Sequence, residues 1–468
     1  MTAGTGNRMA EWIPSRLRRN GPRYLAIVDA LQNDLQNGTL YAGTRLLPHR
    51  ELASRLGLSI GTISKAYAEA ERRGLVVGMV GRGTFVRHRS GSGSASQSAH
   101  SAAIPLDLNV PPPGPEIELL SERFAALPEH PDFRNLFAYL PHQGLRRHRE
   151  AALQWIGPHF TPPLDQLLIC QGAQHAMSLA FSLVTRPGDT VLAECLTYSG
   201  MKALAAHRGI NLVGLAIDRE GLLPDALEEA CKRTGARVLY TMPTLHSPTA
   251  STMSRQRRIE IAEIAERYDL LVIEDDVYHF LAPATPPPVA ALIPERCFYV
   301  SSLSKCVAPG LRVGFLVPPA RYLDRAVLAM RATAWMATPA MVEVGCGMID
   351  NGSLWKLAEK RRSEAAQRRN VAYEILGEGL PPVGDADAAG FHLWLPLPKG
   401  WTAGQFVLSA RRDGVNLAPP EAVAVDETSP EGVRVCFGAP ETVRDLRTGL
   451  GILRDLLRVP SPSALSFV

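Results

Sequence analysis

The sequence of 468 residues predicts two parts: a small α+β head, and a larger α/β body that ends in a smaller α+β subdomain. Three observations lead to this prediction. The first 90 residues contain 14 basic and 6 acidic residues, whereas the remainder is mildly acidic. The stretch 89–104 is rich in Ser, Gly and Ala, so we expect a flexible linker there. Beyond it, apolar strand-like runs alternate with helical patterns. We therefore place the head at 20–88 and the body at 105–460.

The head is predicted to begin with three helices. Apolar residues at helical spacing predict the first helix over 22–36. Pro48 opens a second helix, which ends at Gly57, because proline suits a first turn and glycine suits a C-terminal cap. The third helix is expected over 59–73. The short segment between the second and third helices is then the turn of a helix-turn-helix.

The head is also predicted to carry a wing and to bind DNA. Segments 75–78 and 84–87 are expected to form a hairpin whose tip presents an arginine to a DNA groove. In a helix-turn-helix, the start of the second helix faces base edges, and the basic charge of the head favours a polyanion partner. The alternative is a small helical bundle with solvated charges. The candidate DNA contacts are Arg50, Ser59, Thr62, Ser64, Lys65 and Arg82.

The body is predicted to be built on a mostly parallel sheet that helices cover on both faces. Long helices are expected near 319–332 and 354–376, and the segments around 391–397 and 432–437 indicate the smaller α+β subdomain. The predicted strands are 166–170, 190–193, 238–242, 270–274 and 297–300, with a helix over 255–268.

The most specific motif is SSLSKCVAPGLRVG at 301–314. Lys305 follows two serines, Ser302 and Ser304, and Arg312 stands seven residues further on. This arrangement suits pyridoxal 5'-phosphate (PLP), because the lysine amine can form a Schiff base with the aldehyde while serine and arginine bind the phosphate. The motif therefore predicts a PLP site with Lys305 as its catalytic residue.

Two further features are placed to complete the cofactor site. Gly172, Ala173 and Gln174 follow a predicted strand and open a helix, whose free backbone N–H groups can bind a phosphate. Tyr198 follows another strand end, where its ring can stack on the pyridine ring. Taken alone, the first is an ordinary strand-to-helix turn and the second a packed loop tyrosine.

Three residues are expected near the ring nitrogen and the ring oxygen. In IEDDVY at 273–278, Asp275 can face the pyridine nitrogen and keep it protonated, and Tyr278 can reach the ring hydroxyl. The alternative is a solvated acidic loop. Ser247, in YTMPTLHSPTA, can also hydrogen-bond the ring oxygen, although an ordinary turn around Pro248 explains it equally well.

One arginine is a candidate for effector recognition. Arg434 lies in the apolar run GVRVCFG, and a buried arginine needs an anion. The carboxylate of an amino acid offers a bidentate match. A salt bridge to an internal acid is the alternative, which the local sequence does not exclude.

These motifs, in this order, resemble the fold type I aminotransferases over residues 105–460. The head resembles the winged helix of GntR regulators, chiefly in GTRLLPHRELASRLGLS and GRGTFV. The whole chain is similar to their MocR/GabR-type subfamily. The resemblance implies a cytoplasmic bacterial transcription factor that binds PLP and dimerises head to tail. It also implies that Tyr139, in YLPHQG, reaches the cofactor of the neighbouring subunit.

The chain departs from this family pattern at two places. The family loop usually reads Asn-Pro-Thr-Gly, whereas here it is Ser-Pro-Thr-Ala from Ser247 onward. The shorter serine puts catalytic tuning in question but leaves anchoring of the cofactor at Lys305 intact. Ile60 stands where many of the resembling regulators carry arginine.

The sequence therefore indicates a PLP-dependent transcriptional regulator that senses an amino acid or amine through aldimine exchange at Lys305. Two alternatives stay open: an active aminotransferase that carries a DNA-binding head, and a sensor of PLP itself. The seven cysteines lack paired spacing, which is typical of a reducing cytosol. No segment has the apolar length of a membrane span, and no metal site is expected.

Overall fold

A computed structural model describes the head and the body as two compact units, Met1–Ser98 and Ala99–Val468. The described residues are 12–14, 22–36, 40, 46–72, 75–79, 83–86, 103–114, 116–158, 160–377, 380, 389–426 and 429–459. Most of the predicted linker and the hairpin tip with Arg82 lie outside these residues.

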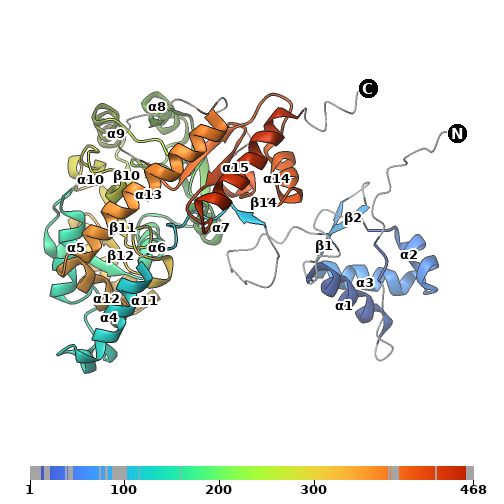
Figure 1. Ribbon diagram of the computed structural model, residues 1–468, viewed down its shortest axis with the longest axis horizontal. Coiled ribbons are helices and arrows are strands. Elements are labelled where there is room, and N and C mark those ends of the chain that lie inside the picture. Colours follow the sequence, from blue (N-terminus) through green and yellow to red (C-terminus); the bar gives the residue numbers. More distant parts are fainter. Residues whose placement is uncertain are drawn as a thin grey trace. The chain divides into compact units, whose positions relative to one another are not determined.

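The head has the predicted order of three helices and a hairpin (Figure 1). The helices are α1 (Arg23–Gln36), α2 (His49–Leu56) and α3 (Ile60–Arg72), and the antiparallel strands are β1 (Val76–Met79) and β2 (Gly83–Val86). Gly57 ends α2 in the left-handed conformation, with φ of 62°. Ser59 caps α3, because its Oγ accepts a hydrogen bond from the Thr62 N–H. The core of the head includes Ile27, Leu31, Leu52, Ile63 and Tyr67.

The body contains a seven-stranded sheet with the order β4-β12-β11-β10-β9-β5-β6. Strand β12 runs antiparallel to both of its neighbours, and the other pairs are parallel. The sheet is therefore mixed, and β6 and β12 are the two strands of this sheet that lie outside the predicted strand runs. The strands are β4 (Leu168–Cys170), β5 (Thr190–Glu194), β6 (Asn211–Leu215), β9 (Val238–Thr241), β10 (Leu271–Asp275), β11 (Cys297–Ser302) and β12 (Gly314–Val317).

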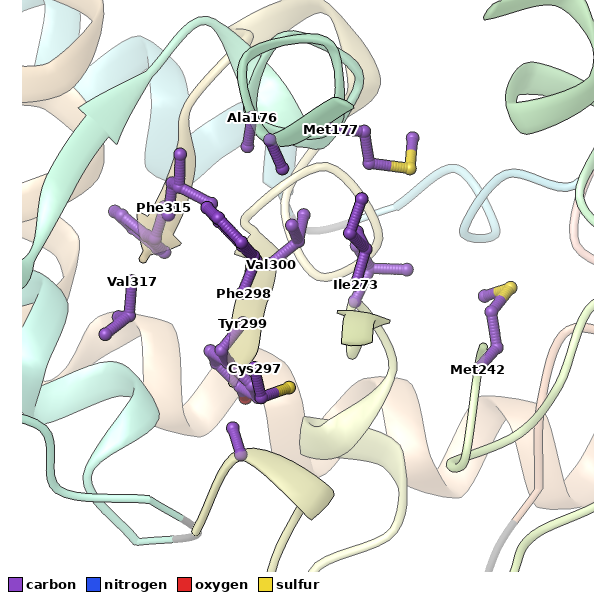
Figure 2. Packing of buried hydrophobic residues seen from close by; sticks show 14 of the residues in the cluster. Ala176, Met177, Met242, Ile273, Cys297, Phe298, Tyr299, Val300, Phe315 and Val317 are labelled. Atoms are coloured by element: carbon purple, nitrogen blue, oxygen red, sulfur yellow. The ribbon is translucent and has the colours of Figure 1, made fainter. Parts of the chain in front are cut away.

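Helices pack on both sides of this sheet and bury it. Figure 2 shows Ala176 and Met177 of α6 (Gly172–Val184) above Val300 and Phe315 of the central strands. Since β11 is buried at every position, it reads as a continuous apolar run rather than an alternating one. The other body helices are α4 (Glu116–Ala126), α5 (Arg146–Ile156), α7 (Ser199–Arg208), α8 (Pro224–Thr234), α9 (Arg255–Arg267), α10 (Val289–Leu292), α11 (Leu323–Thr333), α12 (Pro339–Asp350) and α13 (Ser353–Leu376).

The C-terminal subdomain has its own small core. Strands β13 (His392–Pro396) and β15 (Gly432–Cys436) pair antiparallel. The short strand β14 (Val415–Asn416) pairs parallel with β3 (Ile104–Pro105), so the segment that follows the predicted linker is part of this subdomain. Helices α14 (Ala403–Arg412) and α15 (Val443–Arg458) complete it, and α15 packs against α13 (Figure 1). Its core includes Leu393, Phe406, Val415, Val433 and Leu450.

Two general features concern membranes and metals. No helix in the described part of the chain is long and apolar enough to cross a bilayer. Within the same residues, no group of three or more His, Cys, Asp or Glu side chains is arranged to hold a metal ion. All seven cysteines are free and buried.

Candidate cofactor and effector site

The predicted PLP residues lie at one edge of the sheet, where several strands end. Asp275 is the last residue of β10, and Lys305 follows β11 by three residues. Tyr198 follows β5 and precedes α7, and Gly172 begins α6 just after β4. Parallel strands carry their carboxyl ends to the same edge, so residues far apart in sequence meet there.

Lys305 is hydrogen-bonded to Asn109, in the segment that follows the predicted linker. Its Nζ donates a hydrogen bond of 2.5 Å to the Asn109 carbonyl oxygen and lies 5.8 Å from the centre of the Tyr278 ring. Burial and the positive charge of Arg434 together lower the pKa of Lys305 to about 8, while Asp275 acts in the opposite direction. A lysine with this pKa is a neutral amine, and hence a nucleophile, for a useful fraction of molecules near neutral pH.

Within the described residues, one carboxylate oxygen of Asp275 has a hydrogen-bond partner and the other has none. Its Oδ2 accepts a hydrogen bond of 3.0 Å from the Tyr240 hydroxyl, whereas the buried Oδ1 has no partner. Burial raises the pKa of Asp275 to about 7, and the charge of Asp276 adds to this effect. Asp276 is engaged elsewhere, since its Oδ2 accepts from the Tyr299 hydroxyl at 2.8 Å. Of the two aspartates, only Asp275 belongs to the group around Lys305, and it is a carboxyl group suited to a cationic ligand.

Tyr278 belongs to a hydrogen-bond network that the sequence did not predict. Its hydroxyl oxygen accepts a bond of 2.8 Å from the Asn109 amide, and the same amide nitrogen lies 3.1 Å from His392 Nδ1. His392 Nε2 lies 3.0 Å from the His246 carbonyl oxygen. Burial lowers the pKa of His392 to about 3, so the ring is neutral, with Nε2–H donating and Nδ1 accepting.

Arg312 and the start of α6 form a polar cradle. The Arg312 Nη2 donates a bond of 3.2 Å to the Gln171 carbonyl oxygen, directly before α6. Gly172 has φ of +77°, and a Cβ atom there would stand 2.6 Å from the same Arg312 nitrogen, so the position requires glycine. Ser302 is buried and accepts a bond from the backbone N–H of Ser304, which is half-buried. A guanidinium beside a helix N-terminus is an anion-binding arrangement.

The side chains of Tyr198 and Gln174 both lie close to Gly200. A Cβ at Gly200 would collide with the Tyr198 ring at 2.3 Å and with Gln174 Oε1 at 2.6 Å, and Gln174 Nε2 donates to the Gly200 carbonyl oxygen at 2.9 Å. Burial raises the pKa of Tyr198, and the charge of Asp275 raises it further, which places the two groups near each other. Ala173 lies between Gly172 and Gln174 in the first turn of α6.

Arg434 lies in β15, buried, and bonds neutral oxygens. Its Nη1 donates to Ser247 Oγ at 3.4 Å and its Nη2 donates to the Asp107 carbonyl oxygen at 3.0 Å. Arg434 Nε has no partner among the described residues, and no ion pair of the guanidinium is found there. Burial raises the pKa of the Asp107 carboxyl, and the charge of Arg434 acts against this rise. The salt bridge that the sequence left open is therefore absent from the described part of the chain, and the guanidinium can receive an anion.

Tyr139 is the one predicted cofactor contact that stands apart. It is 83% exposed, and its ring centre lies 5.4 Å from that of Trp335. Among the described contacts, none joins it to the group around Lys305 in its own subunit.

The start of α3 presents part of the predicted DNA-reading face. Arg50, Ser59 and Lys65 are exposed, and Ile60 is 49% exposed. Thr62 and Ser64 are half-buried: the Thr62 hydroxyl bonds that of Ser59, and Ser64 Oγ lies 3.1 Å from His49 Nδ1. Arg82 falls outside the described residues.

Several residues in this site escaped the sequence interpretation. Asn109, His392 and Tyr240 each touch a predicted residue, yet none stands in a recognisable motif. The three prolines at 111–113, two residues after Asn109, are a sequence signal of a restricted backbone there, because proline fixes φ.

Comparison with known proteins matches both parts of the chain. Residues 103–450 match the family described as aminotransferase class I and II, and residues 23–86 match the bacterial regulatory proteins of the gntR family. The HTH-type transcriptional regulator YdeF of Bacillus subtilis (strain 168) is 31% identical over 454 residues, which cover 96% of this chain and 98% of that protein. The HTH-type transcriptional regulator YjiR of Escherichia coli (strain K12) is 26% identical, covering 81% and 86%.

A solved structure agrees with these matches. The kynurenine aminotransferase of Pyrococcus horikoshii, in complex with PMP, has a TM-score of 0.71 and 26% identity, covering 76% of this chain and 91% of that one. The predicted fold class, a winged helix-turn-helix head on a fold type I aminotransferase body, is thus confirmed. The chain belongs to the aminotransferase class I and II family and, through its gntR-family head, to the MocR-type GntR transcriptional regulators.

Proposed function

We propose that Lys305, Asp275 and Arg312 hold PLP in this PLP-dependent, DNA-binding regulator, and that the site senses an amino acid or amine. The residues fit the cofactor. The unpaired Asp275 Oδ1 suits the ring nitrogen, and the Arg312 cradle at α6 suits the phosphate, together with Ser302 and Ser304. When bound, PLP supplies a carbonyl carbon on which an effector amine can replace the Lys305 amine, which is then set free.

The chain's own residues define the class of effector. Lys305, with its lowered pKa, is able to leave and return as a neutral amine. Arg434 offers a guanidinium whose present partners are a hydroxyl and a carbonyl, both weaker acceptors than a carboxylate. An amino acid offers an amine that can replace Lys305 and a carboxylate that can bind Arg434, whereas a simple amine offers only the former. The observation that carries the proposal is that this buried arginine shares one site with Lys305 and Asp275.

Sensing is favoured over turnover by Ser247. Its Oγ accepts a bond from Arg434, so the hydroxyl is drawn to the effector side of the site. Tyr278 remains to orient the ring oxygen. Lys305 would hold and return the proton in any later step, as a general base. We expect amine exchange to be fast, and the later proton transfer to be slow or absent.

The remaining parts of the proposal concern assembly and location. The head, with the proposed bounds 20–88, binds DNA through Arg50, Ser59, Thr62, Ser64, Lys65 and Arg82, joined by the linker 89–104 to the body 105–460. A head-to-tail homodimer gives the exposed Tyr139 a place at the partner's cofactor. A DNA-binding regulator acts where the chromosome is, so we propose the cytoplasm as its location.

A spectral screen tests the proposed function. The PLP-loaded protein is titrated with a panel of amino acids and amines while the absorbance of the cofactor is recorded. We expect at least one compound to change the spectrum at micromolar to millimolar concentration without product accumulating. A panel in which no compound changes the spectrum would contradict amine sensing.

An active aminotransferase is the second candidate, because Lys305, Asp275 and Arg434 occur together in one site. Steady-state transamination with the same panel separates the two. Multiple turnovers at about 1 to 10³ per second, the ordinary range of enzymes, would favour the enzyme. A change in DNA binding on adding PLP alone would instead indicate a sensor of the cofactor itself.

A further inference from the structure

The segment that leads from the linker into the body contacts both Lys305 and Arg434. It begins with β3, which pairs with β14 through the bonds Ile104 N–H to the Gly414 carbonyl (2.8 Å) and Leu106 N–H to the Asn416 carbonyl (3.0 Å). The Leu106 carbonyl then accepts from the Cys436 N–H at 2.9 Å. The chain directly next to the predicted linker is therefore fastened to the subdomain that contains Arg434.

The next three residues contact the groups that the proposed effector would engage. The Asp107 carbonyl oxygen accepts from Arg434, and the Asn109 carbonyl oxygen accepts from Lys305. Three residues further along, the Pro112 carbonyl accepts from the buried Arg361, whose Nε donates to the Cys306 carbonyl at 3.1 Å. The segment 107–112 is thus bonded at its middle to Lys305 and at its end to the loop that carries Lys305.

The Asn109 side chain fixes where its carbonyl points. The amide donates to the Tyr278 hydroxyl at 2.8 Å and lies within hydrogen-bond distance of His392 Nδ1. Both partners are buried, and His392 is neutral, so their positions do not depend on the effector's charge. Without the Asn109 side-chain amide, the residue whose carbonyl accepts from Lys305 would lose its contact with His392 of β13.

The two carbonyl bonds respond to an effector in opposite ways. A free lysine amine has N–H donors for the Asn109 carbonyl, and an amine engaged in a covalent bond to the cofactor has fewer. A carboxylate is a stronger acceptor than a carbonyl, so an effector carboxylate competes with Asp107 for Arg434. The backbone hydrogen bonds of residues 107–109 are therefore expected to differ with and without a bound effector. Because β3 directly precedes these residues and is paired with β14, a change in them would reach the linker through β3.

We propose that Asn109 is a positioning residue that couples effector binding to the linker, because it holds the segment 107–112 against Lys305. This inference rests on the proposed function and deepens it by naming the element that transmits the signal. Lys305 freed by an effector amine binds the Asn109 carbonyl and orders the segment. The ordering of the segment 107–112 extends to β3 only when the Asn109 side chain is present.

The test uses two small probes that capture the PLP carbonyl and release Lys305. Aminooxyacetate carries a carboxylate, and methoxyamine does not. Each is added to the full-length, PLP-loaded protein, capture is followed by absorbance, and hydrogen–deuterium exchange is measured over residues 103–112. We expect both probes to slow exchange at the Ile104 and Leu106 amides. Methoxyamine should slow it more, because its product leaves Arg434 bonded to Asp107.

Three variants complete the test. In Asn109→Ala, capture should persist while the change in exchange is lost, and Asn109→Asp, which keeps the side-chain size, should behave in the same way. Asn211→Ala is the matched control, because this exposed asparagine bonds the Gly188 carbonyl at the sheet edge. It should respond as the parent protein does.

The outcomes separate this inference from the proposed function. Failure of the parent protein to capture either probe would overturn both. Capture without any change in exchange over 103–112 would overturn the coupling role and leave the proposed function standing. The coupling role is likewise overturned if the Asn109 variants respond as the parent does. If Asn109→Ala does not fold, Asn109→Asp decides alone.

Discussion

The effector site in the body and the reading face of the head differ in how far their side chains are already satisfied. In the body, Asp275 Oδ1 and Arg434 Nε are buried and lack partners within the described residues. In the head, Ser59 and Thr62 bond each other, and Ser64 lies beside His49. Arg50 and Lys65, also on this face, are exposed to water.

This difference explains why the structure is informative about one ligand and less so about the other. A buried polar atom without a partner is costly, so it indicates the charge and position of the missing ligand. An exposed side chain is satisfied by water and indicates only that a polyanion can approach. Under the proposed function, the body therefore indicates a cationic ring at Asp275 and a carboxylate at Arg434, whereas the head indicates a polyanion without its base sequence.

The largest expected effect is on covalent attachment in the body. Lys305→Ala should abolish the PLP absorbance band near the visible edge and the adduct that borohydride traps, because the Schiff base is predicted to form on the Lys305 amine. Matched samples of the parent and the variant, reduced and analysed by mass spectrometry, check this. A variant that retained the same adduct would show that another group carries the cofactor.

The next effect tests the head by its salt dependence. Phosphate contacts release counterions, so DNA affinity should fall steeply with salt, and Lys65→Ala should reduce the slope of log K against log salt by about 1. Arg55→Ala is the control, because Arg55 is paired with Glu51 at 3.3 Å. Fluorescence anisotropy with DNA from upstream of its own gene measures both. An unchanged slope in Lys65→Ala would remove this residue from the interface.

A smaller effect is expected at the carboxylate end of the site. Arg434→Ala should leave the cofactor spectrum unchanged and weaken amino-acid binding by about 1.5–3 kcal/mol, the range for a charged hydrogen bond. Methylamine, which lacks a carboxylate, should bind the parent and the variant equally. Equal loss for both ligands would indicate a structural role. Arg447→Ala, at an exposed pair with Glu374, is the matched surface control.

The pH dependence of stability sharpens the comparison further. The pKa of Asp275 rises from 3.8 to about 7 on folding. Between pH 4 and 7 the unfolded chain is already ionised there while the folded chain keeps its proton, so this group lowers stability as pH rises through that window. Cofactor-free Asp275→Asn should therefore gain stability relative to the parent as pH rises from 4 to 7.

The same variant should behave oppositely once PLP is present. Asparagine carries no negative charge to pair with a protonated ring nitrogen, so Asp275→Asn should release PLP more readily in dialysis. Melting temperatures at a series of pH values, with and without PLP, measure both effects. A variant whose stability relative to the parent did not change with pH would show that Asp275 is ionised at no cost in the empty site.

Much of the architecture could be predicted because it depends on local pattern. In the head, α2 ends at Gly57 and α3 begins directly after Ser59, and the predicted body strands agree with the observed ones to within about two residues at each end. Strands β6 and β12 lie outside the predicted strand runs. In β12, the short run GFLV begins two residues after Arg312, and its pairing with β4 depends on long-range contacts. The motifs could be assigned to one site from the sequence, because Asp275 and Lys305 each follow a predicted strand and the carboxyl ends of parallel strands lie at the same end of the sheet.

The support of the site could not be predicted, because it depends on tertiary contacts alone. Asn109 meets His392 across 283 residues of sequence, and Tyr240 meets Asp275 from a neighbouring strand. No spacing rule connects such residues. Ser247 was interpreted as a ring contact from its place in the loop, whereas its hydroxyl lies at hydrogen-bond distance from Arg434, which only the packing of β15 determines.

The central claim, that amine chemistry at Lys305 controls the head, is tested most directly by DNA affinity. The PLP-loaded parent and Lys305→Ala are titrated with DNA from upstream of the gene, with and without aminooxyacetate, at one fixed salt concentration. We predict a change of about 5- to 150-fold in the parent, the usual range of allosteric coupling, and no change in Lys305→Ala. Equal DNA affinity of the parent with and without the probe, despite full capture of the cofactor, would contradict the account.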